Sequence, residues 1–412
     1  MLLRARLLVP MNGPPIEDGA VRIAGDRVAE AGRWRDLRGD AIDLGEVALV
    51  PGLINAHSHL DYTSLAGRIP PPDSFNGWIT SIMRLKNEMD DGTWRASWRE
   101  GAAQCLKHGT TTLGNIETRS DLLPDLLAEV RLRLLLFLEV IVVRPATDAG
   151  QALAEAADFL KGNVPPLGAV GLSPHATYTV RPDALRECVR TAEENDWPLA
   201  MHLAESSDED AMFREGSGAL YQRLAAVERD MADCGGRSPV KLAAEHGALS
   251  KRTLAVHGNY LDDEDVRLLA ESEVSVVHCP RSHEYFGHSE FRFEALRSAG
   301  VNVCLGTDSL ATMPDGGAEL DMFAEMREFC RRHTGIAPED VVKMATVNGA
   351  AALGWQGAVG EISAGAFADL VALPLAGGDV FGEIMNCAEM PVGVMVGGEW
   401  VVLPASCRQV GC

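Results

Sequence analysis

Basic residues are scarce in this sequence relative to acidic ones. Its 412 residues include 37 Lys and Arg against 59 Asp and Glu, which gives a formal net charge of −22 at pH 7. No cluster of Lys or Arg offsets this excess, and a chain this acidic repels phosphate backbones and anionic lipid headgroups. The composition therefore argues against nucleic acids and membranes as partners, and we expect a small-molecule substrate.

Paired cysteines and long hydrophobic runs are also lacking. The nine Cys include no CxxC pair, and their odd number argues against a disulfide framework and for a reducing compartment. The most apolar stretch, Leu132 to Val143, is interrupted by Arg133 and Glu139 and is too short to span a bilayer. The first residues, Met1 to Arg6, have no apolar core of the kind that a signal peptide requires. We therefore expect a cytoplasmic protein.

The sequence does contain a regular alternation of short β-like runs and longer helical stretches. Pro182–Asn195 and Asp262–Ser272 have helical periodicity, and a helix after Trp94 ends before Gly109. The runs rich in Val, Ile, Leu and Thr are Leu49–His57, Thr110–Ile116, Arg133–Val142, Gly168–Ala176, Pro198–Ala204, Thr253–Asn259, Glu273–Pro280 and Val301–Asp308. Eight strands that alternate with helices predict an α/β fold, the (β/α)8 TIM barrel. The alternative, an open doubly wound sheet, requires a Gly-rich phosphate loop after its first strand, and Gly52–His57 is not one.

The two ends of the chain differ from this pattern. Residues 1–48 and 358–412 carry short alternating runs such as Ala20–Ile23, Asp369–Leu373 and Val392–Val396, separated by turn residues. Neither end is long enough to bury a core of its own. We therefore predict that both ends form one small β-sandwich domain beside a catalytic barrel over residues 49–357.

Histidines gather at the ends of the predicted barrel strands, where such barrels place their active sites. His57 and His59 end the first run, and because residues i and i+2 of a strand face the same side, both point into the barrel mouth. Two buried structural histidines would also explain this motif alone. His202 and Asp308 at two further strand ends favour a metal site of three imidazoles and one carboxylate. Such a site leaves room for a water whose pKa the cation lowers.

Glu205 follows His202 by three residues, just beyond the end of the fifth run. On a continuing strand it would face away from His202, but after the strand end the chain can turn it into the site. There it would serve as a general acid and base. The alternative is a solvated side chain in the acidic run Glu205–Asp210.

A set of motifs occurs in order along the chain: Pro51–His59, His108–Thr112, Ser173–Ala176, His202–Glu205, His278–Pro280, Gly306–Ser309 and the tail Val359–Val371. This set resembles the amidohydrolase superfamily. More closely it resembles the branch that holds cytosine and guanine deaminases, S-adenosylhomocysteine-type nucleoside deaminases and triazine hydrolases. The resemblance covers nearly the whole chain, and the set is specific although each motif alone is not.

The resemblance implies a role for each of the strand-end residues. The metal ligands would be His57, His59, His202 and Asp308. The catalytic residues would be Asp308, which accepts a proton from the attacking water, Glu205, which moves it to a ring nitrogen, and His257, which holds the hydroxide or the substrate. His175 would line the pocket.

The resemblance also bears on the metal and on the oligomer. The superfamily's binuclear members use a bridging Lys, and the third and fourth runs contain none. We therefore expect one divalent metal per chain, zinc first, with iron or manganese as alternatives. We also expect a homo-oligomer, a dimer.

Two segments bear on the substrate. Trp78 lies in a region that resembles the nucleoside-binding part of the deaminases, but Asn87 stands where their acidic residue falls, which puts a nucleoside in question. The segment His278–His288 is rich in His and aromatic residues, and we predict a substrate lid in which Arg281 or His283 binds the substrate. A rigid loop satisfied by its own hydrogen bonds is the alternative.

The expected reaction is the deamination of an amino-substituted nitrogen heterocycle by metal-bound hydroxide, because Glu205 is placed to protonate a ring nitrogen. Hydrolysis of a cyclic amide by the same superfamily is the alternative, although it commonly uses a second metal. A metallo-β-lactamase-like hydrolase shares the HxHxD pattern, but Tyr62 stands where that family has a further His. A binding scaffold without chemistry would not keep the full set of strand-end residues.

Overall fold

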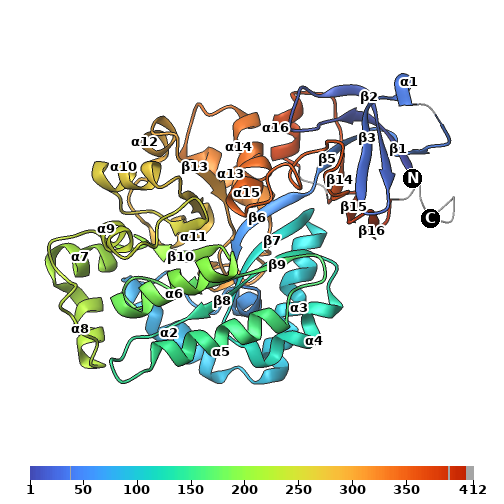
Figure 1. Cartoon of the computed structure of the whole chain (residues 1–412). Helices are drawn as coiled ribbons and strands as arrows, with labels where there is room; N and C mark the ends of the chain where they lie inside the picture. The colour runs from blue at the N-terminus through green and yellow to red at the C-terminus, as the bar shows by residue number, and fades with distance from the viewer. Residues whose placement is uncertain (38, 388–389, 405–412) are drawn as a thin grey trace.

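The computed structural model describes residues 1–37, 39–387 and 390–404, and it contains two sheets (Figure 1). One sheet is a barrel of parallel strands, in which each strand pairs with the next one along the chain. Its strands are β6 (Leu53–Ser58), β7 (Thr110–Glu117), β8 (Arg133–Val140), β9 (Ala169–Pro174), β10 (Leu199–Leu203), β11 (Thr253–His257), β12 (Ser275–His278) and β13 (Asn302–Leu305). The predicted (β/α)8 barrel is confirmed.

The barrel closes where the chain beyond β13 meets β6. The backbone N–H of Thr307 donates to the carbonyl of His57 at 3.0 Å, and Ser58 and Asp308 form a parallel bridge. Gly306 makes this approach possible, because a Cβ there would lie 2.9 Å from the Cβ of His57. The first and last motifs of the chain are therefore neighbours in space.

Helices surround the barrel, apart from α1 (Trp34–Leu37), which lies beside β2 (Ile16–Ala24) and β3 (Arg27–Arg33) of the second sheet (Figure 1). The longer ones are α2 (Phe75–Glu88), α3 (Asp91–Lys107), α5 (Ala149–Gly162), α6 (Pro182–Asn195), α7 (Ser207–Glu215), α8 (Gly218–Ala226), α10 (Asp263–Glu271) and α13 (Met322–Arg332). The shorter ones are α1 (Trp34–Leu37), α4 (Leu123–Glu129), α9 (Pro239–Glu245), α11 (Pro280–Phe286), α12 (Phe293–Ser298), α14 (Pro338–Met344), α15 (Val347–Ala352) and α16 (Val380–Met385), with 3-10 turns over Leu60–Leu65, Ser120–Leu122 and Leu310–Thr312.

The predicted helices are found with small differences in their ends. The helix predicted over Pro182–Asn195 has those bounds, with Pro182 in its first turn. The one predicted from Asp262 begins one residue later, because Asp262 is its N-cap and forms a capping box with Asp265.

Both chain ends meet in the second sheet, where the blue and red strands of Figure 1 lie together. Its strands are β1 (Leu2–Leu8), β2 (Ile16–Ala24), β3 (Arg27–Arg33), β4 (Ile42–Asp43), β5 (Val47–Pro51), β14 (Leu370–Pro374), β15 (Gly393–Val396) and β16 (Glu399–Val402). They follow one hydrogen-bonded path, β16-β15-β14-β5-β1-β2-β3, with β4 beside β1. The ends thus form a continuous small sheet whose buried side chains, including Leu49 and Leu370, share one core.

The predicted run Leu49–His57 is wrong in one respect, because it contains parts of two strands in two sheets. Residues up to Pro51 belong to β5 of the end sheet, and the barrel begins at Leu53. Gly52 lies between them, where a Cβ would come within 1.9 Å of the Thr111 Oγ1. The proposed domain boundary after residue 48 therefore falls inside β5. The division into two domains stays a prediction, and residues 405–412 of the end domain lie outside the described residues.

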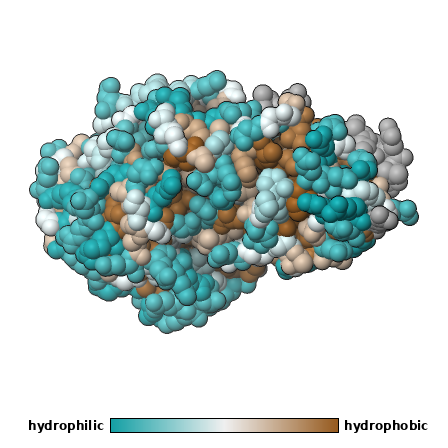
Figure 2. Space-filling model, turned by 90° about the horizontal axis from the view of Figure 1, so that it is seen from above, coloured by the Kyte–Doolittle hydropathy of each residue, from teal (hydrophilic) through white to brown (hydrophobic). Residues whose placement is uncertain are grey.

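A buried ion pair joins the two sheets. The Arg133 Nε of β8 lies 2.7 Å from the Asp369 Oδ2 beside β14, and both side chains are almost fully buried. The outer surface is mostly hydrophilic in the view of Figure 2, with smaller hydrophobic patches. No helix among the described residues has the length and apolar character needed to cross a membrane.

Candidate metal centre and catalytic cavity

The carboxyl ends of three barrel strands bring three histidines and an aspartate together. His57 ends β6, with His59 just beyond it, and His202 lies in β10. The Nε2 atoms of His59 and His202 are 3.3 Å apart, and the Nε2 of His57 lies 3.5 Å from the Asp308 Oδ1. The Nε2 of His59 lies 3.9 Å from the same oxygen. The three imidazoles therefore form one group of possible ligands, and Asp308 adjoins it in a second group with His57 and His257.

This cluster fits a divalent cation. Bonds of about 2.0–2.1 Å in a tetrahedral site place ligand nitrogens about 3.3 Å apart, which is the distance between His59 and His202. The Nε2 of His57 is buried and has no hydrogen-bond partner. His202 lies with its Nδ1 3.0 Å from the carbonyl oxygen of His175, a contact that leaves its Nε2 free as a ligand.

Burial also favours the neutral, metal-binding form of His59 and His202. It lowers the pKa of His202 to about 3 and that of His59 well below its ordinary value, and neighbouring imidazoles act in the same direction. A neutral imidazole offers the lone pair that a metal requires.

Left-handed backbone conformations direct side chains at the strand ends into this site. Ala204, His257 and Asp308 have φ values of 52°, 77° and 56°, which are unusual for residues other than glycine. Such conformations cost free energy and are typical of functional sites. At Ala204 the turn interrupts the alternation of the strand, so that Glu205 enters the cavity instead of facing away.

Glu205 is buried beside His257, with its Oε1 3.6 Å from the imidazole Nε2. Burial, with the nearby carboxylates of Asp308 and Glu209, raises the pKa of Glu205 well above its ordinary value. Its backbone N–H donates to the Glu209 Oε2 at 2.8 Å. Glu205 is thus a positioned carboxylic acid and does not belong to a solvated acidic run.

Asp308 has the opposite protonation preference. Burial by itself would raise its pKa, but the adjacent imidazoles of His57, His257 and His59 hold it below its usual range. Two carboxyl groups in one cavity therefore prefer different states, one protonated and one ionised. That separation is the arrangement required for an acid and a base to act together.

A cavity of about 490 Å³ opens beside this cluster. Its wall includes His59, His202, Glu205, His257 and Asp308. The rest is mostly apolar and aromatic, from α2, α8 and the strand-end loops: Tyr62, Phe75, Trp78, Ile79, Ile82, Met83, Ile141, Val143, Tyr178, Leu220, Leu224 and Val227. The cavity is of the size that takes a small organic molecule.

His175 and Trp78, both predicted to contact substrate, line this cavity. The Nδ1 of His175 is 2.7 Å from the Thr179 hydroxyl, and burial lowers the pKa of His175 to about 3. The indole Nε1 of Trp78 is buried without a hydrogen-bond partner. Both side chains are therefore placed to contact a bound molecule.

Arg281 and His283 do not line the cavity, so the structure does not support the predicted lid. The segment is a helix, α11, and the Arg281 Nε lies 2.5 Å from the buried carboxylate of Glu325. The Nδ1 of His283 lies 3.0 Å from the Asn259 Oδ1. His278, which ends β12, is stacked against Phe291. These side chains have partners within the protein and are not among the residues that line the cavity.

Glu139 and Lys86 line the cavity and were missed by the sequence analysis. The Glu139 side chain is 5% exposed and its Oε1 lies 3.9 Å from the His175 Nε2, without a hydrogen bond. The Lys86 ammonium lies 4.9 Å from the centre of the Tyr62 ring. The sequence does contain a signal for Glu139, because its carboxylate interrupts an apolar strand near the end of that strand. The same interruption also argues against a membrane span.

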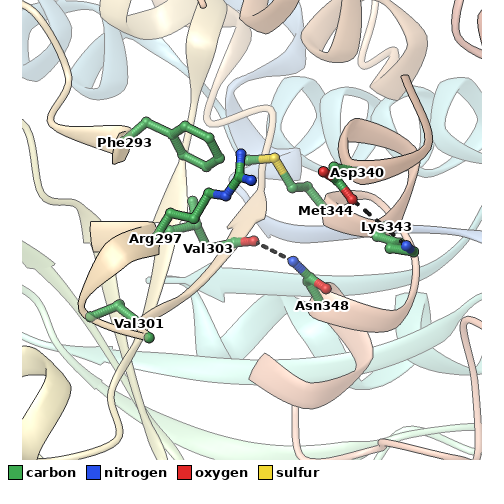
Figure 3. Close-up of a pocket in the computed structure, with 9 residues that line it drawn as sticks. Phe293, Arg297, Val301, Val303, Asp340, Lys343, Met344 and Asn348 are labelled. Carbon is green, nitrogen blue, oxygen red and sulfur yellow. Dashed lines mark hydrogen bonds and ion pairs between the residues drawn. The ribbon is translucent and has the colours of Figure 1, made fainter. Parts of the chain in front are cut away.

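A second hollow, of about 380 Å³, lies at the opposite end of β13 (Figure 3). Arg297 and Lys343 line it, and Asn348 donates to the carbonyl of Val303 at 2.9 Å. The Lys343 ammonium is 2.7 Å from Glu339 and 3.7 Å from Asp340. This end of a barrel contributes to stability more than to catalysis, and its lysine is already paired.

Comparisons with known proteins agree with this geometry. A model of the amidohydrolase family matches residues 48–401. The 5-methylthioadenosine/S-adenosylhomocysteine deaminase of Halobacterium salinarum is 32% identical over 346 residues, which cover 80% of this chain and 74% of that protein.

Solved structures share the fold. An adenosine deaminase from Xanthomonas campestris, with bound zinc, matches with a TM-score of 0.84 and 24% identity over 98% of this chain and 93% of that one. The aminofutalosine deaminase of Helicobacter pylori in complex with methylthio-coformycin also has a TM-score of 0.84, with 21% identity over 97% of this chain and 100% of that one.

Proposed function

This chain belongs to the amidohydrolase family, and we propose that it deaminates an adenine-type nucleoside whose 5′ position carries an apolar group. It is a metal-dependent hydrolase of carbon–nitrogen bonds other than peptide bonds. The observation that carries the proposal is Glu205, a buried carboxyl 3.6 Å from His257 at the edge of the four-ligand cluster. Deamination of an aromatic ring needs such a donor for the ring nitrogen.

The cavity wall is mostly apolar and aromatic, with Lys86, Glu139, Arg144 and Arg223 among its polar members, and this combination suits a nucleoside. A purine ring fits beside His175 and the indole of Trp78, both of which line the cavity. The apolar side chains of α2 and α8 favour an uncharged substituent such as a methylthio group. Two relatives act on or bind molecules of this kind, as their names state.

The residues of this chain divide the chemistry as follows. His57, His59, His202 and Asp308 would hold the cation, which when bound supplies a Lewis acid that lowers the pKa of a water in the site. Asp308 accepts a proton from the attacking water at a carboxylate oxygen. Glu205 donates a proton to the ring nitrogen next to the reacting carbon, and His257 orients the water. The proton that Asp308 accepted then passes to the leaving amine, which departs as ammonia. The remaining hydroxyl proton returns to Glu205 as the ring carbonyl forms.

We further infer one zinc ion per chain, since β8 and β9 contain no lysine to bridge a second ion. Three overlapping groups could in geometry hold an ion: His57, His59 and His202; His57, His257 and Asp308; and Glu139, His175 and His202. Because the groups share His57 or His202, we infer a single ion among them. We infer also that the protein acts as a homodimer in the cytoplasm, with no nucleic-acid partner, as its acidic composition suggests.

The test is an assay for ammonia and for the ultraviolet shift of the purine. Adenosine, 5′-methylthioadenosine and S-adenosylhomocysteine are compared with a panel of cyclic amides. We expect ammonia from the nucleosides, with 5′-methylthioadenosine preferred over adenosine. Turnover confined to the cyclic amides would show that the cluster hydrolyses an amide bond instead.

A further inference from the structure

Helix α11 lies directly after β12 and carries three consecutive residues with buried partners. Pro280 occupies its first turn, and Gly287 ends it with a φ of 63°. Arg281, Ser282 and His283 each reach a different part of the protein. None of the three lines the catalytic cavity, so the helix has no direct access to a substrate there.

Ser282 reaches the carboxylate of Asp308. Its hydroxyl donates to the Asp308 Oδ2 at 2.7 Å, and both side chains are buried. The other oxygen, Oδ1, is the one that faces His57 and His59. The hydroxyl therefore holds one oxygen of the carboxylate and turns the second toward the predicted metal position. Such outer partners orient ligands and affect how tightly a metal is held.

His283 reaches Glu205 through Asn259. The Asn259 Nδ2 donates to the carbonyl oxygen of Glu205 at 2.9 Å, so the Asn259 Oδ1 faces the other way. That oxygen lies 3.0 Å from the His283 Nδ1, which must therefore carry the proton and donate it. The backbone N–H of Asn259 also donates to Ala204, the left-handed residue that turns Glu205 into the cavity. All of these groups are buried.

Arg281 anchors the helix that carries these contacts. Its Nε lies 2.5 Å from the Glu325 Oε1, and its backbone N–H donates to the Oε2 of the same carboxylate at 3.0 Å. Its Nη2 donates to the carbonyl oxygen of Glu319 at 3.0 Å. The Glu325 side chain is fully buried. A bidentate contact of this kind fixes both the position and the direction of the helix.

We propose that α11 positions the two carboxyl groups of the reaction, with Ser282 orienting Asp308 and His283 orienting Glu205 through Asn259. The assignment of the two carboxyl groups rests on the proposed function, but the hydrogen bonds do not. Adjacent residues of one helix thereby fix the position of the base, Asp308, relative to that of the acid, Glu205. Ser282 and His283 are positioning residues and do not touch the substrate.

The first experiment uses Ser282→Ala and Ser282→Thr in the metal-loaded protein, with Ser289→Ala as a control at an exposed position just beyond the helix. We measure kcat, KM and the rate of metal loss to an excess of chelator. Ser282→Ala is expected to lower kcat or weaken metal retention by about 10- to 100-fold, the usual effect of losing an outer partner. Ser282→Thr keeps the hydroxyl and should recover most of both, and Ser289→Ala should change neither.

The second experiment tests the contact of His283 with Asn259 separately from that of Ser282 with Asp308. His283→Phe should lower kcat with KM unchanged, since the positioned group is Glu205, and should leave metal retention unchanged, since Glu205 is not a ligand. His283→Gln, which keeps an N–H donor, should recover part of the loss. If Ser282→Ala does not fold, this pair decides the proposal.

Three results would overturn the proposal. Wild-type kcat and metal retention in Ser282→Ala would show that Asp308 needs no support, and wild-type kcat in His283→Phe would show the same for Glu205. A raised KM with unchanged kcat in either variant would show contact with the substrate instead. The chelator measurement uses no substrate, so it still tests whether Ser282 orients Asp308 if the protein proves not to deaminate nucleosides.

Discussion

Replacing Glu205 by Gln tests the chemistry most directly, because the change removes the acid with almost no change in shape. The side chain is buried and lies 3.6 Å from His257, so the amide occupies the same space but has no proton to transfer to a ring nitrogen. General acid–base catalysis contributes at least about 10²-fold, or about 2.7 kcal/mol of the barrier. We expect Glu205→Gln to lose at least that factor in kcat and to keep its metal.

The same substitution should not destabilise the protein. Burial raises the pKa of Glu205, so the folded state keeps this proton at pH values where the unfolded chain has lost it. The carboxyl therefore lowers stability progressively as the pH rises above its unfolded pKa, and it costs nothing below that value. Gln has no such titration, so Glu205→Gln should unfold at an equal or higher temperature than the wild type at neutral pH.

The assay combines ammonia release, elemental analysis and thermal unfolding. Glu215→Gln serves as the matched control, because Glu215 is exposed at the last residue of α7. The control should behave as the wild type in all three measurements. Wild-type kcat in Glu205→Gln would refute the assignment of the proton donor, and loss of metal would show that Glu205 is a ligand.

Three further outcomes are expected. Elemental analysis of protein purified without chelator should give near one equivalent of divalent metal, and His202→Ala should lose metal and activity together; two equivalents would contradict the single site. Trp78→Phe keeps an aromatic ring in the cavity wall but removes part of its apolar surface, so KM should rise about fivefold, equivalent to about 1 kcal/mol, with kcat unchanged. Arg133→Ala leaves Asp369 buried without its partner and should cost about 3–5 kcal/mol in denaturant unfolding, while Arg133→Met with Asp369→Leu should recover much of it.

Much of the barrel could be predicted because its signal is local. A buried strand is a short apolar run, and the helix from Pro182 to Asn195 has a proline start and a clear 3.6-residue period. The error at residues 49–51 arose because β5 and β6 are both apolar and separated by one glycine. Hydrophobicity does not say to which sheet a buried strand belongs, since both positions exclude water equally.

Some residues of the candidate site could likewise be predicted from the sequence, and others could not. The histidines and Asp308 could be placed because they lie at strand ends, where the alternation of side chains and the topology of the barrel restrict their direction. The positions of Arg281 and His283, which follow a strand end, could not be predicted in this way. Glu139 lies on a strand, but the apolar residues around it gave no sign that its carboxylate lines the cavity.

The sequence by itself determined which groups would meet at the barrel mouth, namely three imidazoles and the carboxylate of Asp308. The physical reason is that strands of period two, closed in chain order, leave few directions for a side chain at their ends. Only the tertiary structure decided the direction of Glu205, which depends on a left-handed turn at Ala204, and the direction of Arg281 and His283, which depends on how α11 packs. Both depend on contacts between residues far apart in the chain, such as Arg281 with Glu325, which no local pattern encodes.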